Sequence, residues 1–191
     1  FNVVRFSTGV EPFSQQLVSA SGENVGRALT FVDRFEALGG TNISEALDTA
    51  LTHTPTGDRP YYVVFLTDGL PTVGVTDANH ILSRVRENTG NSQTRFFTFG
   101  VGFDVNTALL DTLAAENRGT AEYLDPGENI EVKVSSFYRK VSRPMLADVT
   151  LDLGGAQAFD VYPKQLPDLF SGTQLIVMGR YKGRSQQNVR L

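Results

Sequence analysis

The 191 residues suffice for one α/β domain and part of a second, and a content of 40% hydrophobic and 20% charged residues excludes disordered and collagen-like chains. The net charge of −4 argues against a general nucleic-acid binder, and the absence of cysteine excludes disulfide frameworks and cysteine-bound zinc. No apolar run reaches the roughly 18 residues of a membrane-spanning helix, and the first residues lack the pattern of a signal peptide, so we expect a soluble chain without a targeting segment.

Strand and helix patterns alternate from the start of the chain. Asn2 to Ser7 is predicted to be a strand, and apolar residues at helical spacing predict a helix over Asn24–Leu38. A second helix, Ile43–Leu51, follows the loop Gly39-Gly40-Thr41-Asn42. The run Tyr61–Leu66 is apolar at every position, which is typical of a central parallel strand that helices cover on both faces.

The same alternation continues to about residue 141. Helices are predicted around Ile81–Val85, Leu109–Ala114 and Ile130–Val141, with strands at Phe96–Val101 and Glu122–Leu124. The sequence therefore predicts an α/β fold, a doubly wound and mostly parallel sheet with helices on both faces.

After Arg143-Pro144 the spacing of apolar residues changes from helical to every second residue, which is typical of strands. Val149 to Leu153, Phe159 with Val161, and Gln174 to Tyr181 are predicted to be strands. We therefore place a domain boundary near Ser142 to Pro144, which gives an α/β domain over 1–143 and a partial β-sandwich over 144–191. Strand-like sequence at both ends leads us to expect a larger protein on either side.

Two oxygen-bearing loops are the candidate site. Asp68 follows the apolar run at the carboxyl end of its strand, where ligands of open parallel sheets bind. Thr41 lies in the glycine-rich loop that opens the second helix. A hydroxyl and a carboxylate form half of a site for Mg²⁺, which prefers oxygen ligands and keeps several waters. A turn carboxylate and a helix-capping threonine explain the same residues without a metal, and the residues alone leave both interpretations open.

The loops resemble motifs of a known family. Gly39-Gly40-Thr41-Asn42-Ile43 and the segment Phe65 to Thr72 (FLTDGLPT) look like the second and third metal-site motifs of von Willebrand factor A domains. Phe99 to Gly102 and Asn2 to Thr8 resemble strands of that family, so the resemblance covers about Phe1 to Arg143. The sequence is closer still to the heavy chains of inter-alpha-trypsin inhibitor and their bacterial relatives, through three short segments: Ser135 to Tyr138, Asp160 to Pro163 and Leu166 to Phe170.

The resemblance implies a metal ion-dependent adhesion module, extracellular, periplasmic or on the cell surface, rather than an enzyme. Its Mg²⁺, or Ca²⁺ or Mn²⁺, would contact Thr41 and Asp68 and would bind a protein ligand through an acidic side chain. The family's first metal motif, Asp-x-Ser-x-Ser, occurs nowhere in the chain. We expect this motif on a central strand before Phe1, and therefore weak or no metal binding by these residues alone and possible dimerisation through the place of that strand.

Two other classes of protein remain open. A hydrolase on a similar sheet would use Asp68, but the sequence has no Gly-x-Ser-x-Gly elbow. A structural scaffold that binds no metal would need neither a metal site nor a catalytic site. His53 and His80 lie on different predicted helices without other ligand types at metal-binding spacing, and Gly100-Val101-Gly102 lacks the third glycine of a dinucleotide fingerprint.

Overall fold

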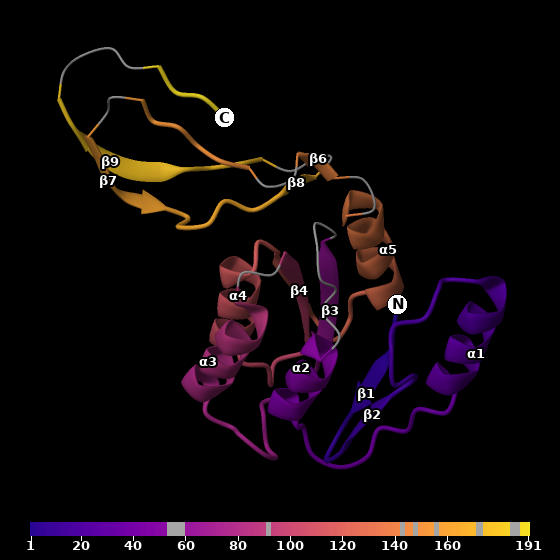
Figure 1. Cartoon of the computed structure of the whole chain (residues 1–191). Coiled ribbons are helices and arrows are strands. Elements are labelled where there is room, and N and C mark those ends of the chain that lie inside the picture. The colour runs from indigo at the N-terminus through magenta and orange to yellow at the C-terminus, as the bar shows by residue number, and fades with distance from the viewer. Residues whose placement is uncertain are drawn as a thin grey trace.

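A three-stranded parallel sheet forms the centre of the fold. In the computed structural model, β3 (Tyr61–Thr67), β4 (Thr94–Val101) and β5 (Ala121–Leu124) pair in the order β3-β4-β5 (Figure 1). The structure describes residues 1–52, 60–90, 93–141, 144–146, 149–154, 157–170, 174–183 and 188–191. In this part of the chain, no helix is long and apolar enough to cross a membrane.

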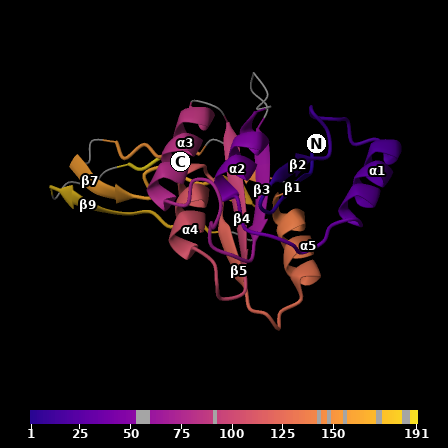
Figure 2. The same cartoon turned by 90° about the horizontal axis from the view of Figure 1, so that it is seen from below.

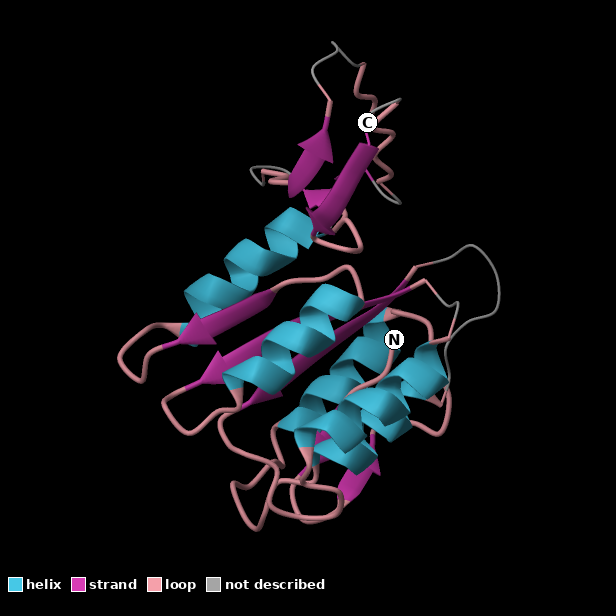
Figure 3. Ribbon diagram, turned by 90° about the vertical axis from the view of Figure 1, so that its left-hand side faces the viewer, coloured by secondary structure: helices cyan, strands magenta, loops and turns pink. Residues whose placement is uncertain are grey.

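Among the described residues, five helices accompany the sheet: α1 (Gly22–Val32), α2 (Ile43–Leu51), α3 (Ala78–Thr89), α4 (Thr107–Glu116) and α5 (Ile130–Val141). Each begins after a residue whose side-chain oxygen accepts a hydrogen bond from the backbone N–H three residues later, and these residues are Ser21, Asn42, Asp77, Asn106 and Asn129. Figure 3 shows the helices beside the parallel strands. The fold class predicted from the sequence is confirmed.

The side chains of β4 alternate between two cores on opposite faces of the sheet. Phe96 packs with α2, α3 and α4, and the Thr98 hydroxyl on the same face donates to the Leu110 carbonyl oxygen of α4. Phe97 and Phe99 point to the other face, where both rings lie edge-on against Phe137 of α5. Figure 1 shows α2, α3 and α4 on one side of the sheet and α5 on the other.

In the described part of the chain, β3 lies at the edge of the sheet, whereas the sequence predicts a place inside it. Among the described strands it pairs only with β4, so it is an edge strand. Val63 and Phe65 are buried against α2 and α3, whereas Val64 and Leu66 on the other face are 45% and 40% exposed. The prediction that helices cover both faces of this strand was therefore wrong, because α5 packs over β4 and leaves the outer part of β3 uncovered.

The helix predicted over Asn24–Leu38 was also wrong in its length. α1 ends at Val32, and Ala28 is its one buried residue. Beyond it, Phe35 meets the ring of Phe31 edge-on at 5.1 Å between centroids and lies under the guanidinium of Arg5. These contacts hold the chain after Val32 in a non-helical turn, whereas the apolar spacing alone predicts that the helix continues to Leu38.

A two-stranded antiparallel sheet, β1 (Val4–Phe6) and β2 (Val10–Pro12), lies on the free-edge side of β3. In Figures 1 and 2 this sheet and α1 are at one end of the molecule and the C-terminal hairpin is at the other. The ring of Phe6 stacks on that of Phe65 at 5.3 Å between centroids. The first predicted strand is thus confirmed and contacts the main core.

The C-terminal part is rich in short strands, as predicted. β6 (Pro144–Leu146) pairs with β8 (Leu169–Phe170), and β7 (Gln157–Tyr162) pairs with β9 (Met178–Lys182), both antiparallel. β9 starts four residues later than the predicted strand at 174. In place of the strand predicted over 149–153, the structure has a single bridge between Asp152 and Arg190.

Two buried contacts join the C-terminal part to the main sheet. The guanidinium of Arg95 on β4 donates to the carboxylate of Asp168 at 2.5 and 3.3 Å, and both side chains are 1% exposed. The Phe170 ring packs against Phe97 in the core beneath α5. Ser142 and Arg143 lie outside the described residues, and the boundary between 143 and 144 stays a prediction.

Candidate metal site at the carboxyl edge of the sheet

Three loops meet where β1 and β3 end. β1 leads into Ser7 and Thr8, β3 leads into Asp68, and the loop before α2 lies between them with Gly40 and Thr41. The backbone N–H of Asn42 donates to the Ser7 carbonyl oxygen at 2.8 Å, and that of Gly40 donates to the Thr8 hydroxyl at 2.8 Å. The loop with Thr41 is thus fixed to the end of β1.

Thr41 is also bound to the loop that follows Asp68. Its backbone N–H donates to the Thr72 hydroxyl at 2.8 Å, and its carbonyl oxygen accepts from the N–H groups of Thr72 and Val73. The Thr41 hydroxyl oxygen lies 3.3 Å from the position that a Cβ on Gly69 would occupy. The structure therefore brings the two predicted loops together, with the Thr41 hydroxyl directly beside the residue after Asp68.

Two glycines allow this close approach. A Cβ on Gly40 would lie 2.5 Å from a methyl carbon of Val73 and 2.9 Å from the Thr72 hydroxyl. Gly74 has a φ of +68°, which favours glycine, and a Cβ there would lie 2.7 Å from the side-chain oxygen of Asn42. Asn42 itself is buried and caps α2. The glycines are needed because side chains of the neighbouring loops pack directly against their backbone.

Asp68 presents its carboxylate to solvent. The residue is exposed, and among the described residues no hydrogen bond or ion pair to its carboxylate is found. The preceding residue, Thr67, is buried and forms a tight turn in which its hydroxyl bonds with the N–H and the carbonyl oxygen of Gly69. The end of β3 is thus held in place while the Asp68 carboxylate is exposed to solvent.

A family profile for the von Willebrand factor type A domain matches residues 1–123, well over half of the chain. The chain belongs to this family. Among curated proteins it is 33% identical to the inter-alpha-trypsin inhibitor heavy chain H4 of Homo sapiens over 96% of its own length, and 31% identical to the Mus musculus heavy chain 4 over 94%. The chain spans about a fifth of the length of these relatives.

Solved structures support the same fold. A von Willebrand factor type A protein from Catenulispora acidiphila aligns over 99% of this chain and 47% of its own, with 23% identity and a TM-score of 0.70. Proximal thread matrix protein 1 from the mussel byssus aligns over 71% of this chain and 33% of its own, with 20% identity and a TM-score of 0.54, and that structure has zinc in its MIDAS motif. At these identities the likeness concerns the fold.

The side-chain oxygens at this edge of the von Willebrand factor type A domain are of the chemical type that a hard cation such as Mg²⁺ binds. Thr41 supplies a hydroxyl and Asp68 a carboxylate, and Mg²⁺ takes about six oxygen ligands, several of them water. In the described part of the chain, no three histidine, aspartate or glutamate side chains come together as a metal-binding group. Two protein oxygens would fill only part of the coordination shell of such an ion, and the remaining positions would need water or other donors.

The other residues considered from the sequence do not join this site. His80 is exposed near the start of α3, where its backbone N–H binds the cap Asp77, and His53 lies outside the described residues. Gly100 is packed against Tyr123, whose ring carbon lies 2.8 Å from the position of an added Cβ. Sequence reasoning missed Thr8, whose hydroxyl fixes the Thr41 loop, because no local pattern links residues 8 and 40.

Proposed function

We propose that this von Willebrand factor type A domain is a metal-dependent, non-enzymatic protein-binding module of an extracellular or surface protein. Thr41 and Asp68 each give one oxygen ligand, direct or through water, to a divalent cation, with Mg²⁺ as the expected ion and Ca²⁺ or Mn²⁺ as alternatives. A carboxylate of the protein ligand takes an open position on the cation. The kinship with inter-alpha-trypsin inhibitor heavy chains supports this class of function.

The observation that carries the proposal is the exposed carboxylate of Asp68. Its carboxylate is exposed at the end of β3, and no hydrogen bond or ion pair from the described residues occupies it. The loop that follows it is bonded to Thr41, and the Thr41 hydroxyl lies beside Gly69, the residue after Asp68. A cation is the partner that suits both oxygens.

The chain's own residues hold the site open and oriented. Thr72 and Thr8 accept hydrogen bonds from the backbone of the Thr41 loop, so their hydroxyls position that loop rather than bind the cation. When bound, the cation supplies a positive charge that attracts an acidic side chain of the partner. Because two oxygens are few for Mg²⁺, which releases water reluctantly, we expect these 191 residues alone to bind Mg²⁺ too weakly to measure near physiological concentration.

Titration calorimetry with Mg²⁺ and Mn²⁺ on the intact parent protein tests the proposal. Asp68→Ala should weaken metal affinity by about 10- to 100-fold, the usual range for loss of a group that orients or binds a metal. Asp104→Ala is the matched control, since Asp104 is an exposed carboxylate on the loop that follows the neighbouring strand β4. Equal affinity in the wild type and Asp68→Ala, or an equal loss in both variants, would place the metal elsewhere.

Assays on the wild type and the same two variants also distinguish the two alternative functions. A hydrolase that used Asp68 would turn over ester or phosphate substrates and lose that activity in Asp68→Ala. A metal-free scaffold would bind its neighbours equally well in Mg²⁺ and in a chelator. The partial oxygen site favours the metal-dependent module over both.

A further inference from the structure

The C-terminal hairpin of β7 and β9 has two different faces. The pairing sets Phe159 opposite Arg180 and Tyr162 opposite Met178. The register shifts between these two pairs, where Asp160 has a φ of +51°, so the strand contains a bulge there. Because the extra residue of a bulge reverses the alternation of side chains, both aromatic rings lie on the face that carries Met178 and Arg180.

The opposite face of the hairpin is apolar. A Cβ on Gly179 would lie 3.1 Å from a methyl carbon of Val161, so the Val161 side chain belongs to this second face. Leu175 and Val177, at alternate positions before Gly179, are half-buried. In the sandwich that the sequence predicts, these side chains would point inward, and the face with Arg180 would remain in water.

Two lysines lie against the aromatic rings of the outer face. The Lys182 Nζ is 5.5 Å from the centroid of the Phe159 ring, and the Lys164 Nζ is 4.7 Å from the centroid of the Tyr162 ring. These cation–π contacts hold both ammonium groups on the face that carries the rings. The lysines therefore add two positive charges beside Arg180.

Positive charge predominates on this part of the molecule. Asp160, which lies 3.6 Å from the Arg180 guanidinium, is the one acidic residue within 157–164 and 174–183. Residues 170–191 contain four arginine or lysine residues and no aspartate or glutamate, although the whole chain has a net charge of −4. The cationic face consists of Phe159, Tyr162, Lys164, Met178, Arg180 and Lys182.

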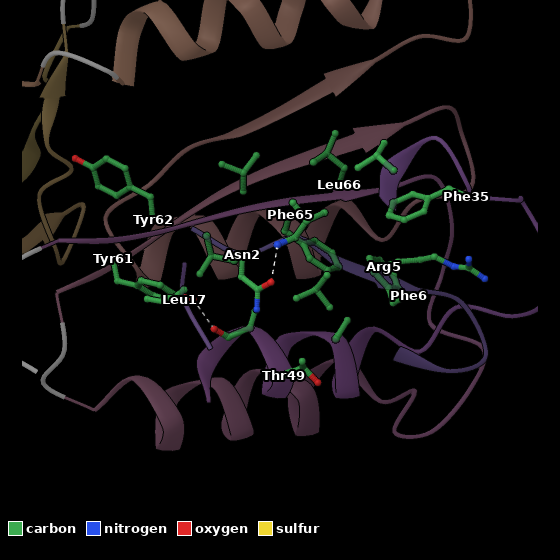
Figure 4. Close-up of a pocket in the computed structure, with 17 residues that line it drawn as sticks. Asn2, Arg5, Phe6, Leu17, Phe35, Thr49, Tyr61, Tyr62, Phe65 and Leu66 are labelled. Atoms are coloured by element: carbon green, nitrogen blue, oxygen red, sulfur yellow. Dashed lines mark hydrogen bonds between the residues drawn. The ribbon is translucent and has the colours of Figure 1, made fainter. Parts of the chain in front are cut away.

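The cationic face also presents apolar side chains to solvent. Met178 is 70% exposed, Tyr162 is 58% exposed, and Ile176 just before β9 is 65% exposed. Figures 1 and 2 show the hairpin at the end of the molecule away from α1. None of these residues line the cavity between β1 and β3 (Figure 4), so the cationic face stays exposed when the expected central strand fills that cavity.

We infer that the cationic face binds the surface of an anionic phospholipid membrane. Lipid phosphates lie beside Lys164, Arg180 and Lys182, while Met178 and Tyr162 enter the boundary between head groups and acyl chains. The exposed apolar side chains favour a lipid surface over a soluble polyanion, because a hydrated polyanion offers them no apolar medium. The cationic face shares no residue with the candidate metal site, and membrane binding does not depend on the proposed metal.

Sedimentation of the intact parent protein with sucrose-loaded vesicles tests the inference. Vesicles of phosphatidylcholine and phosphatidylglycerol in equal amounts are compared with vesicles of phosphatidylcholine alone, in a chelator, so that no metal joins the protein to the lipid. The protein should bind the mixed vesicles and not the neutral ones. No binding to the mixed vesicles, or equal binding to both kinds, would overturn the inference.

Two double variants test the charges. Arg180→Gln/Lys182→Gln should weaken binding to the mixed vesicles about 25-fold, because each lysine or arginine near an anionic surface contributes about fivefold. Arg27→Gln/Arg34→Gln is the matched control, since it removes the same charge from exposed residues at the other end of the molecule and should have no effect. An equal loss in both double variants would show a general effect of net charge and refute the assignment to the hairpin.

A single variant distinguishes a lipid surface from a soluble polyanion. Met178→Asn should weaken binding to the mixed vesicles about threefold or more, because it removes apolar surface that enters the lipid. Val132→Asn, which changes a valine of α5 that is 62% exposed, should leave binding unchanged. Unchanged binding of Met178→Asn, together with full competition by dextran sulfate, would identify a soluble polyanion as the partner and contradict the membrane assignment.

Discussion

Removal of the Asp168 carboxylate should destabilise the protein strongly, because it leaves the Arg95 guanidinium buried without its main acceptor. Both side chains are 1% exposed, and two hydrogen bonds join them. Loss of one member of such a pair costs about 3–5 kcal/mol. Domains of this size have a total free energy of unfolding of about 5–15 kcal/mol, so Asp168→Ala should remove about a fifth or more of the stability.

Urea denaturation followed by circular dichroism measures this loss. The variants are Asp168→Ala, Arg95→Met and the double variant Arg95→Met/Asp168→Leu, with Asp125→Ala as an exposed control that should stay within about 0.5 kcal/mol of wild type. The double variant should recover most of the stability, because apolar residues of similar volume replace a buried pair at little net cost.

A loss of less than about 1 kcal/mol in Asp168→Ala would contradict a buried pair, since such a value is typical of a solvent-exposed pair. A double variant as unstable as the sum of the two single variants would contradict it as well, because the two side chains would then act independently. Either result would mean that the segment with Asp168 is not anchored to β4 in solution.

Three further predictions concern the loops and one tyrosine. Asp68→Ala should change the free energy of unfolding by no more than about 0.5 kcal/mol in urea titrations, because the side chain is exposed and fills no core. Gly40→Ala should cost about 1–3 kcal/mol in the same assay, since its methyl group would overlap Val73 and Thr72, and a loss below about 0.5 kcal/mol would show that the loops yield easily. Burial, and then the hydrogen bond to Asp111, raise the pKa of Tyr123 above its usual value of 10, so Asp111→Asn should lower this pKa in an NMR titration of the ring carbons, and an unchanged pKa would contradict the bond.

The regular part of the fold could be predicted because its signals are local. The helix that begins after Asn42 and the strand at Phe96–Val101 follow from spacing, and both are confirmed. The place of Tyr61–Leu66 at the edge could not be predicted, because an apolar residue at every position shows that a strand can be buried on both faces but not that a neighbour is present.

The candidate site was predicted as two loops but not as a joined structure. The residue types in the Thr41 and Asp68 loops indicate oxygen ligands for a cation, whereas the hydrogen bonds that the Thr41 loop donates to Thr72 and Thr8 depend on tertiary folding. The Arg95–Asp168 pair spans 73 residues and has no signal in either local sequence.

A crystal structure of the intact parent protein soaked in Mn²⁺, with anomalous diffraction, tests the central claim most directly. We predict one Mn²⁺ at the carboxyl edge of the sheet, bound to the Thr41 hydroxyl, with the Asp68 carboxylate as a ligand or joined to the metal through one water. A fully occupied Mn²⁺ that has neither residue in contact, or an Asp68 carboxylate paired with a lysine or arginine in the presence of the metal, would contradict the assignment.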